Sequence, residues 1–365
     1  MLRKTSSELR AMTKGMVINM KDKKIGFAIL GCGVVANYHS AAIFELSDSA
    51  TLVGVADNKY ERAKAFADEH ETYAFKDFDE VLKCPEVNVV CICTPSGLHA
   101  EAAIAAAKAG KHLVIEKPLG ITKEQLDAVE QACEEKNIKA ACILQSRFYR
   151  SIRKVKTAIN EGILGRIVCA DVYMKYSRTQ QYYDSSKWRG TKAIDGGGAL
   201  MNQGIHGVDL LMYMAGDVKS VFAYSKTLAR NIEVEDTLVC VLEFESGATG
   251  VIEATTSVYP GYPRLLNIHG DKGTISLEEN LIVRWDIETS ANEEDLVITP
   301  IRFSAAHTPT AISPDGHMLQ IEDMVNAIKE DRKPMIDCAE GRKCVDIILA
   351  IYRSAEEKKV VYISK

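Results

Sequence analysis

The chain has 365 residues, a formal net charge of −5 at pH 7 and 47% hydrophobic residues. This length exceeds the usual size of one domain, so we expect two domains, each with a sizeable core. The charge offers no basic field for nucleic acid or anionic lipid, and the longest apolar runs are far shorter than the roughly 20 residues of a membrane span, so we expect neither partner.

Residues 1–23 are basic and polar and contain no continuous apolar stretch of the secretory type. We expect a disordered extension here, with an organelle-targeting role as a minor alternative. The ten cysteines form no CxxC pair and show no zinc-type spacing with histidine. They predict reduced, buried thiols and a cytoplasmic protein, and we expect no metal site.

From residue 24 onward, short apolar runs alternate with helical patterns. The predicted strands are residues 25–30, 51–56, 87–93, 112–115 and 140–144, and the predicted helices are residues 35–45, 61–69, 78–83, 99–109 and 123–136. Strands that are apolar throughout are buried on both faces, so the alternation indicates a parallel, doubly wound sheet. We expect an α/β Rossmann domain over residues 24–147.

After a helix predicted at residues 152–161, longer strands with alternating polarity follow. They are predicted at residues 166–175, 218–228, 236–245, 248–257, 264–269, 273–277 and 281–287, with helices at residues 316–329 and 341–358. Alternation implies one packed face and one free face. We therefore expect residues 148–365 to form an α+β domain for substrate binding, with a large, mainly antiparallel open sheet.

The free face of that sheet is a candidate interface for a homodimer or homotetramer. At the start of one of its strands, Glu233, Glu235 and Asp236 are interpreted as solvated carboxylates.

The hexapeptide Gly31-Cys32-Gly33-Val34-Val35-Ala36 has the pattern G-x-G-x-x-A between an apolar strand and a helix. The two glycines permit a tight turn and close approach of the backbone to a pyrophosphate. The helix N-terminus then favours the negative charge. In this context the turn predicts a dinucleotide site, with Val34, Val35 and Ala36 beside the cofactor.

Asp57 ends the second predicted strand, where a carboxylate can accept hydrogen bonds from the adenosine ribose. It would repel a 2′-phosphate, and the adjacent Asn58 and Lys59 do not supply the arginine of an NADP site. We therefore expect NAD as the cofactor, with NADP left open by the nearby Arg62. A helix-capping aspartate is the structural alternative.

Three further segments carry a family resemblance. Residues 94–99 are Thr-Pro-Ser-Gly-Leu-His, residues 116–118 are Glu-Lys-Pro, and residues 196–206 are Gly-Gly-Gly-Ala-Leu-Met-Asn-Gln-Gly-Ile-His. With the nucleotide turn, in this order and spacing, they resemble the Gfo/Idh/MocA family of sugar and inositol dehydrogenases from about residue 24 to the C-terminus. Residues 182–184, 188–191 and 195–209 look most like members acting on nucleotide-linked amino sugars, including the UDP-N-acetylglucosaminuronate 3-dehydrogenases.

Glu116 and Lys117 follow a buried strand at the carboxyl edge of the parallel sheet, where such sheets place ligands. An ammonium there can hydrogen-bond the reacting hydroxyl and stabilise developing alkoxide charge. By resemblance, the Lys117–Pro118 bond is expected to be cis. The alternative is a solvated lysine paired with Glu116.

Asn202, His206 and Asp209 have i, i+4, i+7 spacing, which puts them on one face of a helix predicted to begin near Ala199. Because histidine titrates near neutrality, we predict His206 as the general base, with a buried core histidine as the alternative. Many family members have aspartate where this chain has Asn202, so we assign Asn202 to sugar orientation. Asp209 contacts substrate or orients His206.

The remaining site residues come from loops. The resemblance places residues 94–99 against the pyrophosphate and nicotinamide ribose, so Thr94, Pro95, Ser96, Leu98 and His99 are predicted cofactor contacts, with helix capping as the alternative for Thr94 and His99. Arginine holds phosphate or carboxylate, and aromatic rings stack on sugars or bases. The predicted substrate contacts are Gln145, Arg147, Tyr149, Tyr182, Trp188 and Arg189. The alternative is that these side chains only hold their loops in place.

Together these features predict an NAD-dependent oxidoreductase acting on CH–OH groups, which oxidises a secondary hydroxyl of a sugar, nucleotide sugar or inositol to a ketone. Two alternatives stay open: a redox-neutral glycoside-processing enzyme with tightly bound NAD, and a non-catalytic NAD-binding protein.

Overall fold

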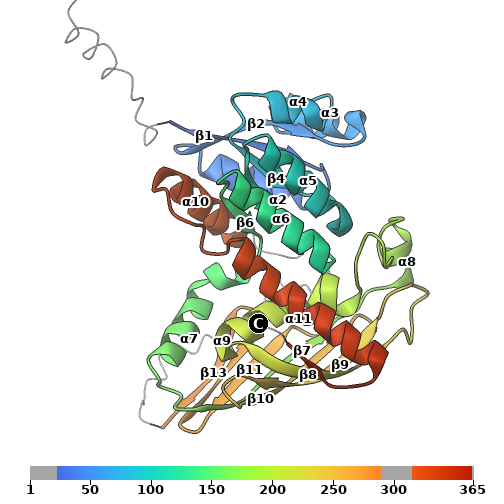
Figure 1. Ribbon diagram of the computed structural model, residues 1–365, viewed down its shortest axis with the longest axis vertical. Helices are drawn as coiled ribbons and strands as arrows, with labels where there is room; N and C mark the ends of the chain where they lie inside the picture. Colours follow the sequence, from blue (N-terminus) through green and yellow to red (C-terminus); the bar gives the residue numbers. More distant parts are fainter. Residues whose placement is uncertain (1–22, 289–314, 364–365) are drawn as a thin grey trace, which may run out of the picture.

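The computed structural model describes residues 23–288 and 315–363. The predicted N-terminal extension therefore lies outside the described residues, apart from Lys23. Two sheets organise the described chain, one of six strands and one of eight, and Figure 1 shows the six-stranded sheet above the eight-stranded one. Within the described ranges, no helix is both long and apolar enough to cross a membrane.

The first sheet has the predicted parallel, doubly wound arrangement. Its strands are β1 (Ile25–Leu30), β2 (Ala50–Ala56), β3 (Tyr73–Ala74), β4 (Val89–Ile92), β5 (His112–Ile115) and β6 (Ala140–Cys142). They lie in the order β3-β2-β1-β4-β5-β6, and all five pairings are parallel. The direction of strand order reverses between β1 and β4, and such a switch opens a crevice at the carboxyl ends of the strands.

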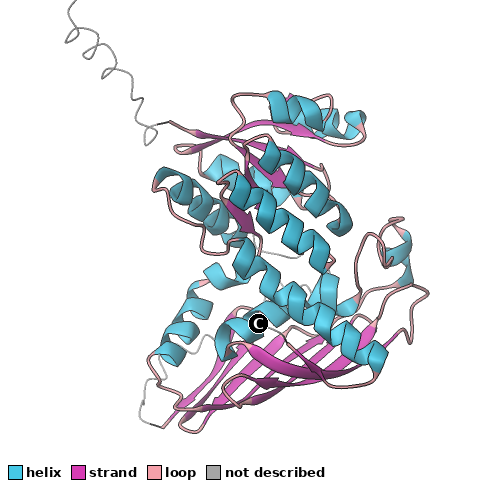
Figure 2. Ribbon diagram, viewed as in Figure 1, coloured by secondary structure: helices cyan, strands magenta, loops and turns pink. Residues whose placement is uncertain are grey.

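Helices cover both faces of this sheet (Figure 2). They are α2 (Ala36–Glu45), α3 (Tyr60–Glu69), α4 (Phe78–Lys83), α5 (His99–Lys108) and α6 (Lys123–Glu135). Successive residues of β1 point to opposite faces: Phe27 packs in one core cluster with α2 and α3, and Ala28 packs in the other with α5 and α6. This two-sided burial is why the strands are apolar throughout.

A helix from the far end of the chain also belongs to this layer. The side chains of Ile321, Met324 and Val325 on α10 (Asp315–Lys329) are buried in the core cluster that contains β1 and α2. The predicted division at residue 147 assigned this helix to the second domain, but its apolar face completes the core of the first sheet.

The second sheet is mainly antiparallel, as predicted. Its strands are β7 (Ile167–Lys175), β8 (Val218–Lys226), β9 (Thr237–Phe244), β10 (Thr249–Thr255), β11 (Leu265–Gly270), β12 (Gly273–Glu278), β13 (Leu281–Ile287) and β14 (Val361–Tyr362). The order is β13-β12-β11-β7-β10-β9-β8-β14, and only the pair β7–β10 is parallel. The two-residue strands β3 and β14 were not predicted because they are too short to show a pattern.

One face of this sheet carries helices α7 (Arg150–Asn160), α9 (Ile205–Ala215) and α11 (Cys338–Glu357), as Figure 1 shows. On β9, Leu238 and Cys240 point into the core below these helices, whereas Val239 and Val241 are 41% and 52% exposed on the opposite face. Helix α11 begins at Cys338, earlier than predicted, because the side chain of Asp337 accepts a hydrogen bond from the backbone N–H of Glu340.

A buried ion cluster joins the layers. Arg147 lies in the short 3-10 helix η3 (Gln145–Phe148) after β6, and its guanidinium donates two hydrogen bonds to Asp209 Oδ1 at 2.6 and 3.0 Å. A further nitrogen donates to Glu340 of α11 at 2.8 Å. Burial alone would lower the pKa of Arg147, but the charge and hydrogen bonds of Asp209 raise it. Arg147 and Asp209, which were predicted as substrate contacts, thus pair with each other inside the protein, and a contact of either with substrate stays a prediction.

We predict that Asp209→Asn destabilises the fold, because it leaves the buried guanidinium of Arg147 without its main counter-charge. The expected loss in the free energy of unfolding is about 3–5 kcal/mol, measured by urea denaturation. The control is Asp346→Asn, which removes a partner of the more exposed Arg342 and should cost less than about 1 kcal/mol. Equal small losses in both variants would contradict this role.

Candidate active site

The turn between β1 and α2 has the form that a dinucleotide requires. Gly31 has φ of 96°, and a Cβ there would approach the carbonyl oxygen of Cys93 to 2.8 Å, so this position requires glycine. A Cβ on Gly33 would have no atom within 4 Å, which leaves open space above the turn. Val34 is exposed, Val35 partly buried and Ala36 fully buried against the sheet.

Asp57 holds this turn from the end of β2. Its Oδ2 accepts a hydrogen bond from the backbone N–H of Cys32 at 2.9 Å and its Oδ1 one from Lys59 N–H at 2.9 Å. Arg62 pairs with the same carboxylate at 3.2 Å. A carboxylate has about four acceptor positions, so Asp57 can still accept from a ribose hydroxyl. The neighbouring Asn58 is exposed.

The loop after β4 contributes both open and enclosed groups. Thr94 Oγ1 is buried and has no hydrogen-bond partner among the described residues, so it is available to a ligand. Pro95 is partly buried, Ser96 is buried and Leu98 is 43% exposed. His99 does not fit its predicted role. Its ring nitrogens each lie 2.7 Å from a backbone carbonyl, of Pro118 and of Thr94, and the side chain ties this loop to the next strand end.

The structure also corrects the role of Glu116. Its Oε1 lies 2.9 Å from Nε2 of His39 on α2 and 3.3 Å from Nε2 of His317 on α10. Its Oε2 accepts from the backbone N–H of Lys117 at 3.3 Å. Burial opposes ionisation of Glu116, but the hydrogen bonds from His317 and His39 outweigh it and lower the pKa. This carboxylate is an internal tie, not a cofactor contact.

These three side chains are also close enough to hold one metal ion, because their ligand atoms lie within 4.8 Å of one another. No spacing rule could have found them, since they are far apart in the chain. However, metal-binding histidines normally donate their second ring N–H to an acceptor. Nδ1 of both His39 and His317 has no partner among the described residues. Direct hydrogen bonding to Glu116 explains the cluster better than metal binding.

Lys117 reaches from the end of β5 to the second layer. Its Nζ donates to the backbone oxygen of Asn202 at 3.0 Å and lies 3.4 Å from Asn202 Oδ1. The Lys117–Pro118 bond is cis, as the resemblance implied. Burial lowers the pKa of Lys117, whereas the charges of Glu116 and Asp195 raise it. The structure thus brings together Lys117 and Asn202, which are 85 positions apart.

His206 lies in the first turn of α9, and the charge of Lys117 affects its titration. Burial first, and then the charges of Lys117 and Arg264, lower the pKa of His206 to about 3. The expectation that this histidine titrates near neutrality is therefore wrong. Its ring is neutral at pH 7 and can accept a proton. Its Nδ1 is buried and has no partner among the described residues.

The segment that carries these residues is not one regular helix. Residues Ala199–Gly204 form a π-helix, η4, before α9 begins at Ile205. The wider π-helical turn changes the direction in which successive side chains point. Asn202, His206 and Asp209 therefore do not share the face that regular α-helical spacing predicts. Asn202 meets Lys117, whereas Asp209 meets Arg147.

The predicted aromatic contacts gather beside this segment. Near α8 (Gln180–Asp184), the guanidinium of Arg189 lies over the rings of Tyr182 and Trp188, 4.6 and 5.3 Å from their centres. Gln203 donates to the Tyr182 hydroxyl at 3.1 Å, which connects this group to Asn202.

Gln145 and Tyr149 lie at the junction of the two layers. A Cβ on Gly316, at the start of α10, would approach the Gln145 side chain to 2.9 Å and the Tyr149 hydroxyl to 3.1 Å. Both side chains therefore pack against α10. The buried Gln145 Oε1 has no partner among the described residues, which leaves it an acceptor for a ligand.

Two carboxylates were missed as site residues. Glu235 is buried, not solvated, and accepts hydrogen bonds from Leu200 N–H at 2.8 Å and Gly198 N–H at 3.0 Å. It fixes the start of η4, and a Cβ on Gly198 would collide with its backbone oxygen. Asp195 is 1% exposed and accepts from Asn202 Nδ2 at 2.6 Å. Glu235 lies outside every motif, and Asp195, although it begins the resembling segment 195–209, received no role, because hydrogen bonds to η4 cannot be read from the sequence.

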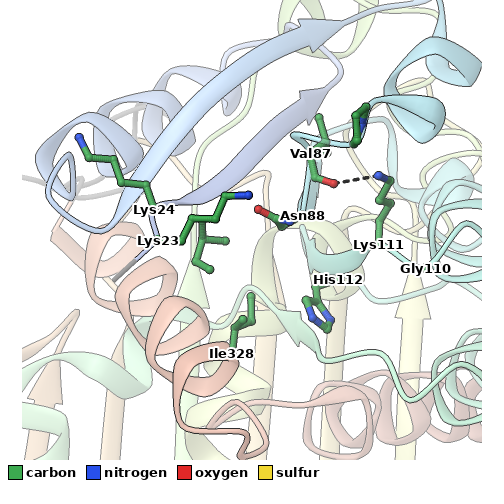
Figure 3. A pocket seen from close by; sticks show the side chains of 10 residues that line it. Lys23, Lys24, Val87, Asn88, Gly110, Lys111, His112 and Ile328 are labelled. Atoms are coloured by element: carbon green, nitrogen blue, oxygen red, sulfur yellow. Dashed lines mark hydrogen bonds between the residues drawn. The ribbon is translucent and has the colours of Figure 1, made fainter. Parts of the chain in front are cut away.

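A pocket at the other edge of the parallel sheet is not part of this site (Figure 3). Its lining includes Lys23, Asn88, Lys111 and His112, at the N-terminal ends of the strands. Lys111 donates to the carbonyls of Cys84 at 2.7 Å and Val87 at 2.9 Å, so its ammonium is used within the protein. Open α/β sheets bind ligands at the opposite, carboxyl edge.

Comparison with known proteins finds matches over both parts of the chain. A model described as "Oxidoreductase family, NAD-binding Rossmann fold" matches residues 25–143, and the "GFO/IDH/MocA C-terminal domain" matches residues 152–276. The WlbA dehydrogenase of Bordetella pertussis, solved in complex with NADH and UDP-GlcNAcA, is 34% identical with a TM-score of 0.85, covering 94% of this chain and 100% of that chain.

Two other relatives extend the comparison. The myo-inositol 2-dehydrogenase of Thermotoga maritima is 25% identical over 91% of this chain and 97% of its own length. A levoglucosan dehydrogenase in complex with NADH and levoglucosan is 25% identical with a TM-score of 0.83, covering 94% of this chain and 100% of that chain.

We predict that Asp57→Asn weakens binding of NADH by about ten-fold, because a hydrogen bond to a charged group is worth about 1.5–3 kcal/mol. Binding of NADPH should stay equal or improve, since the variant removes a negative charge that repels the 2′-phosphate. Fluorescence titration of both nucleotides measures the two dissociation constants. An equal loss for NADH and NADPH would show that Asp57 only supports the turn.

Proposed function

The chain belongs to the GFO/IDH/MocA oxidoreductase family, and on that basis we propose that it oxidises a secondary hydroxyl of a sugar to a ketone, with NAD⁺ as the acceptor. The observation that carries this proposal is the meeting of Lys117 with Asn202 at the carboxyl edge of the parallel sheet; His206 follows four residues after Asn202, and the Lys117 charge lowers its pKa. Lys117 follows β5 of the first sheet, Asn202 lies in η4, and His206 lies in α9.

The residues at the β1–α2 turn fit NAD. Gly31 and Gly33 leave room for the pyrophosphate at the N-terminus of α2, Asp57 can accept from the ribose, and Thr94 Oγ1 is free to bond. When bound, NAD⁺ supplies the hydride acceptor. The protein supplies placement and electrostatics.

Lys117 donates a hydrogen bond to the substrate hydroxyl and stabilises negative charge on that oxygen. Its ammonium is held by two oxygens of Asn202, so it is oriented before substrate arrives. Asn202 can both donate to and accept from a sugar hydroxyl, which assigns it to ring orientation.

His206 takes the hydroxyl proton. Its pKa, lowered to about 3, makes it a weak base, but it also keeps the ring neutral and ready to accept. Loss of hydride makes the remaining O–H group strongly acidic, so a weak base is sufficient once the hydride moves. Proton transfer therefore accompanies hydride departure and does not precede it.

The substrate class we favour is a nucleotide-linked amino sugar oxidised at ring carbon 3. The Bordetella relative was solved with UDP-GlcNAcA. In this chain Tyr182, Trp188 and Arg189 form an aromatic and cationic group connected to Asn202 through Gln203. Aromatic rings suit a base or sugar face, and a guanidinium suits phosphate or carboxylate. Gln145 and Tyr149 are further candidate contacts.

We also propose a cytoplasmic homodimer or homotetramer. All ten cysteines are free thiols, as expected in a reducing compartment. The sheet face opposite the helices presents Val241 with Phe222 and Val251 beside it in the strand register, and Val239 beside Tyr224. An apolar patch of this kind on a sheet suits burial against a second copy.

The test is reduction of NAD⁺ at 340 nm with a panel of inositols, free sugars, glycosides and UDP-sugars. We expect UDP-N-acetylglucosaminuronic acid to be the best substrate. His206→Asn and Lys117→Met should each lower kcat by about 10²–10⁴-fold, the usual range for a lost general base or charge stabiliser.

The same panel separates the alternatives. NADH that forms only transiently, with no free NADH accumulating, would indicate redox-neutral chemistry. NADH binding with no turnover of any substrate would indicate a binding protein. Near-normal single-turnover reduction of NAD⁺ by either variant would remove that residue from the mechanism.

We predict that Val241→Lys dissociates the oligomer, because it places a charge in the centre of the apolar face. Light scattering after gel filtration should show the monomer mass for this variant and a multiple of it for the wild type. Phe44→Lys, a matched change of a 46% exposed residue on α2, should leave the mass unchanged. A wild type that is monomeric would contradict the proposed interface.

A further inference from the structure

Asp195 has no role in the mechanism above, although its carboxylate is buried beside the site. It lies in the loop between α8 and η4 and is 1% exposed. Its Oδ2 accepts from the backbone N–H of Gly190 at 2.8 Å, and its Oδ1 accepts from Asn202 Nδ2 at 2.6 Å. One oxygen thus anchors the loop, and the other contacts the residue that holds Lys117.

The contact with Asp195 decides which way the Asn202 amide points. An ionised carboxylate only accepts hydrogen bonds, so Asn202 must turn its NH₂ group toward Asp195. Its Oδ1 then faces the opposite way, where Lys117 Nζ lies 3.4 Å away and Gln203 Nε2 also 3.4 Å away. If the amide were reversed, its NH₂ group would oppose the Lys117 ammonium, donor against donor.

The charges support the same connection. Asp195 is one of the two carboxylates that raise the pKa of Lys117 against the effect of burial. Burial raises the pKa of Asp195 to about 6, while the Gly190 N–H, Lys117, Asn202 and Arg189 lower it. Burial raises the pKa of Tyr183, and the charge of Asp195 adds to that shift. At pH 7 Asp195 is therefore mainly ionised.

We propose that Asp195 is a positioning residue for Lys117: through the amide of Asn202 it keeps an oxygen acceptor against the ammonium and provides a counter-charge behind it. The proposal rests on the proposed function for its effect on turnover, but the Asp195–Asn202–Lys117 chain is testable without any substrate. Asn202 alone could not fix its own orientation, since its two amide ends are nearly equal in shape.

The first experiment is Asp195→Asn, which keeps an oxygen for the Gly190 N–H but loses the charge and the obligatory acceptor. With the best substrate from the panel, kcat should fall about ten- to a hundred-fold, as for a misplaced catalytic group, while KM and the affinity for NADH change less than about three-fold.

The pH profile of kcat/KM adds a readout that a purely structural role would not change. In the wild type, kcat/KM should fall as the pH drops through about 6, because Asp195 is protonated there. His206, with a pKa of about 3, does not change its protonation in this range. Asp195→Asn should lack this limb.

The rescue is the exchange variant Asp195→Asn/Asn202→Asp, in which the carboxylate meets Lys117 and the amide stands behind it. This exchange restores an acceptor and a negative charge at Lys117, so its kcat should be at least about ten-fold higher than that of Asp195→Asn. The matched control is Asp331→Asn, the same change at an exposed carboxylate, just after α10, that accepts from Lys139. It should leave kcat and the pH profile unchanged.

Competitive labelling with acetic anhydride measures Lys117 directly. Its reactivity, followed by mass spectrometry across pH, gives a midpoint that Asp195→Asn should lower by about half a pH unit, less than the 1–3 units of a direct ion pair. If no sugar reduces NAD⁺, the proposed function fails while this shift still supports Asp195. An unchanged midpoint, or a loss of kcat that the exchange variant does not recover, overturns the proposal.

Discussion

The carboxylate of Glu116 binds together three parts of the molecule that lie far apart in the chain. It accepts hydrogen bonds from His39 of α2, the helix after the nucleotide turn, and from His317 of α10. It also accepts one from the backbone N–H of Lys117. A buried carboxylate without such partners would be costly. The position of Lys117 relative to the nucleotide turn therefore depends on this cluster, and so does the docking of α10 on the first sheet.

The order of elements and both sheet types followed from the sequence pattern. Apolar strands with intervening helices predict the parallel sheet, and alternation along residues 238–244 predicts a sheet with one open face, because burial on one or two sides selects those patterns. The packing of α10 on the first sheet was not predictable, since the apolar face of a helix does not specify which surface it packs against. Nor was the π-helix at residues 199–204, whose start depends on hydrogen bonds to Glu235 in the loop before β9.

The candidate site was predictable where a motif carries it, and less so where tertiary contacts decide a side chain's role. Motifs marked both Lys117 and Asn202, and the structure places them in hydrogen-bond contact. Arg147, Asp209, Glu116 and His99 have the right residue types for binding, but internal partners occupy them. The titration of His206 depends on burial and on Lys117 and Arg264, none of which is adjacent in the chain. The contact of Asp195 with Asn202 was not predicted, although residues 195–209 carry the resemblance, because a resemblance does not show which side chains hydrogen-bond each other.

The central claim is that Lys117, Asn202 and His206 serve hydride transfer from a sugar carbon. The most direct measurement uses UDP-N-acetylglucosaminuronic acid deuterated at ring carbon 3, mixed with the enzyme and NAD⁺. Our account predicts that the deuterium appears on the nicotinamide ring, seen by mass spectrometry of the reduced cofactor, together with a 3-keto product. Reduced cofactor without deuterium, or deuterium lost to water, would contradict it.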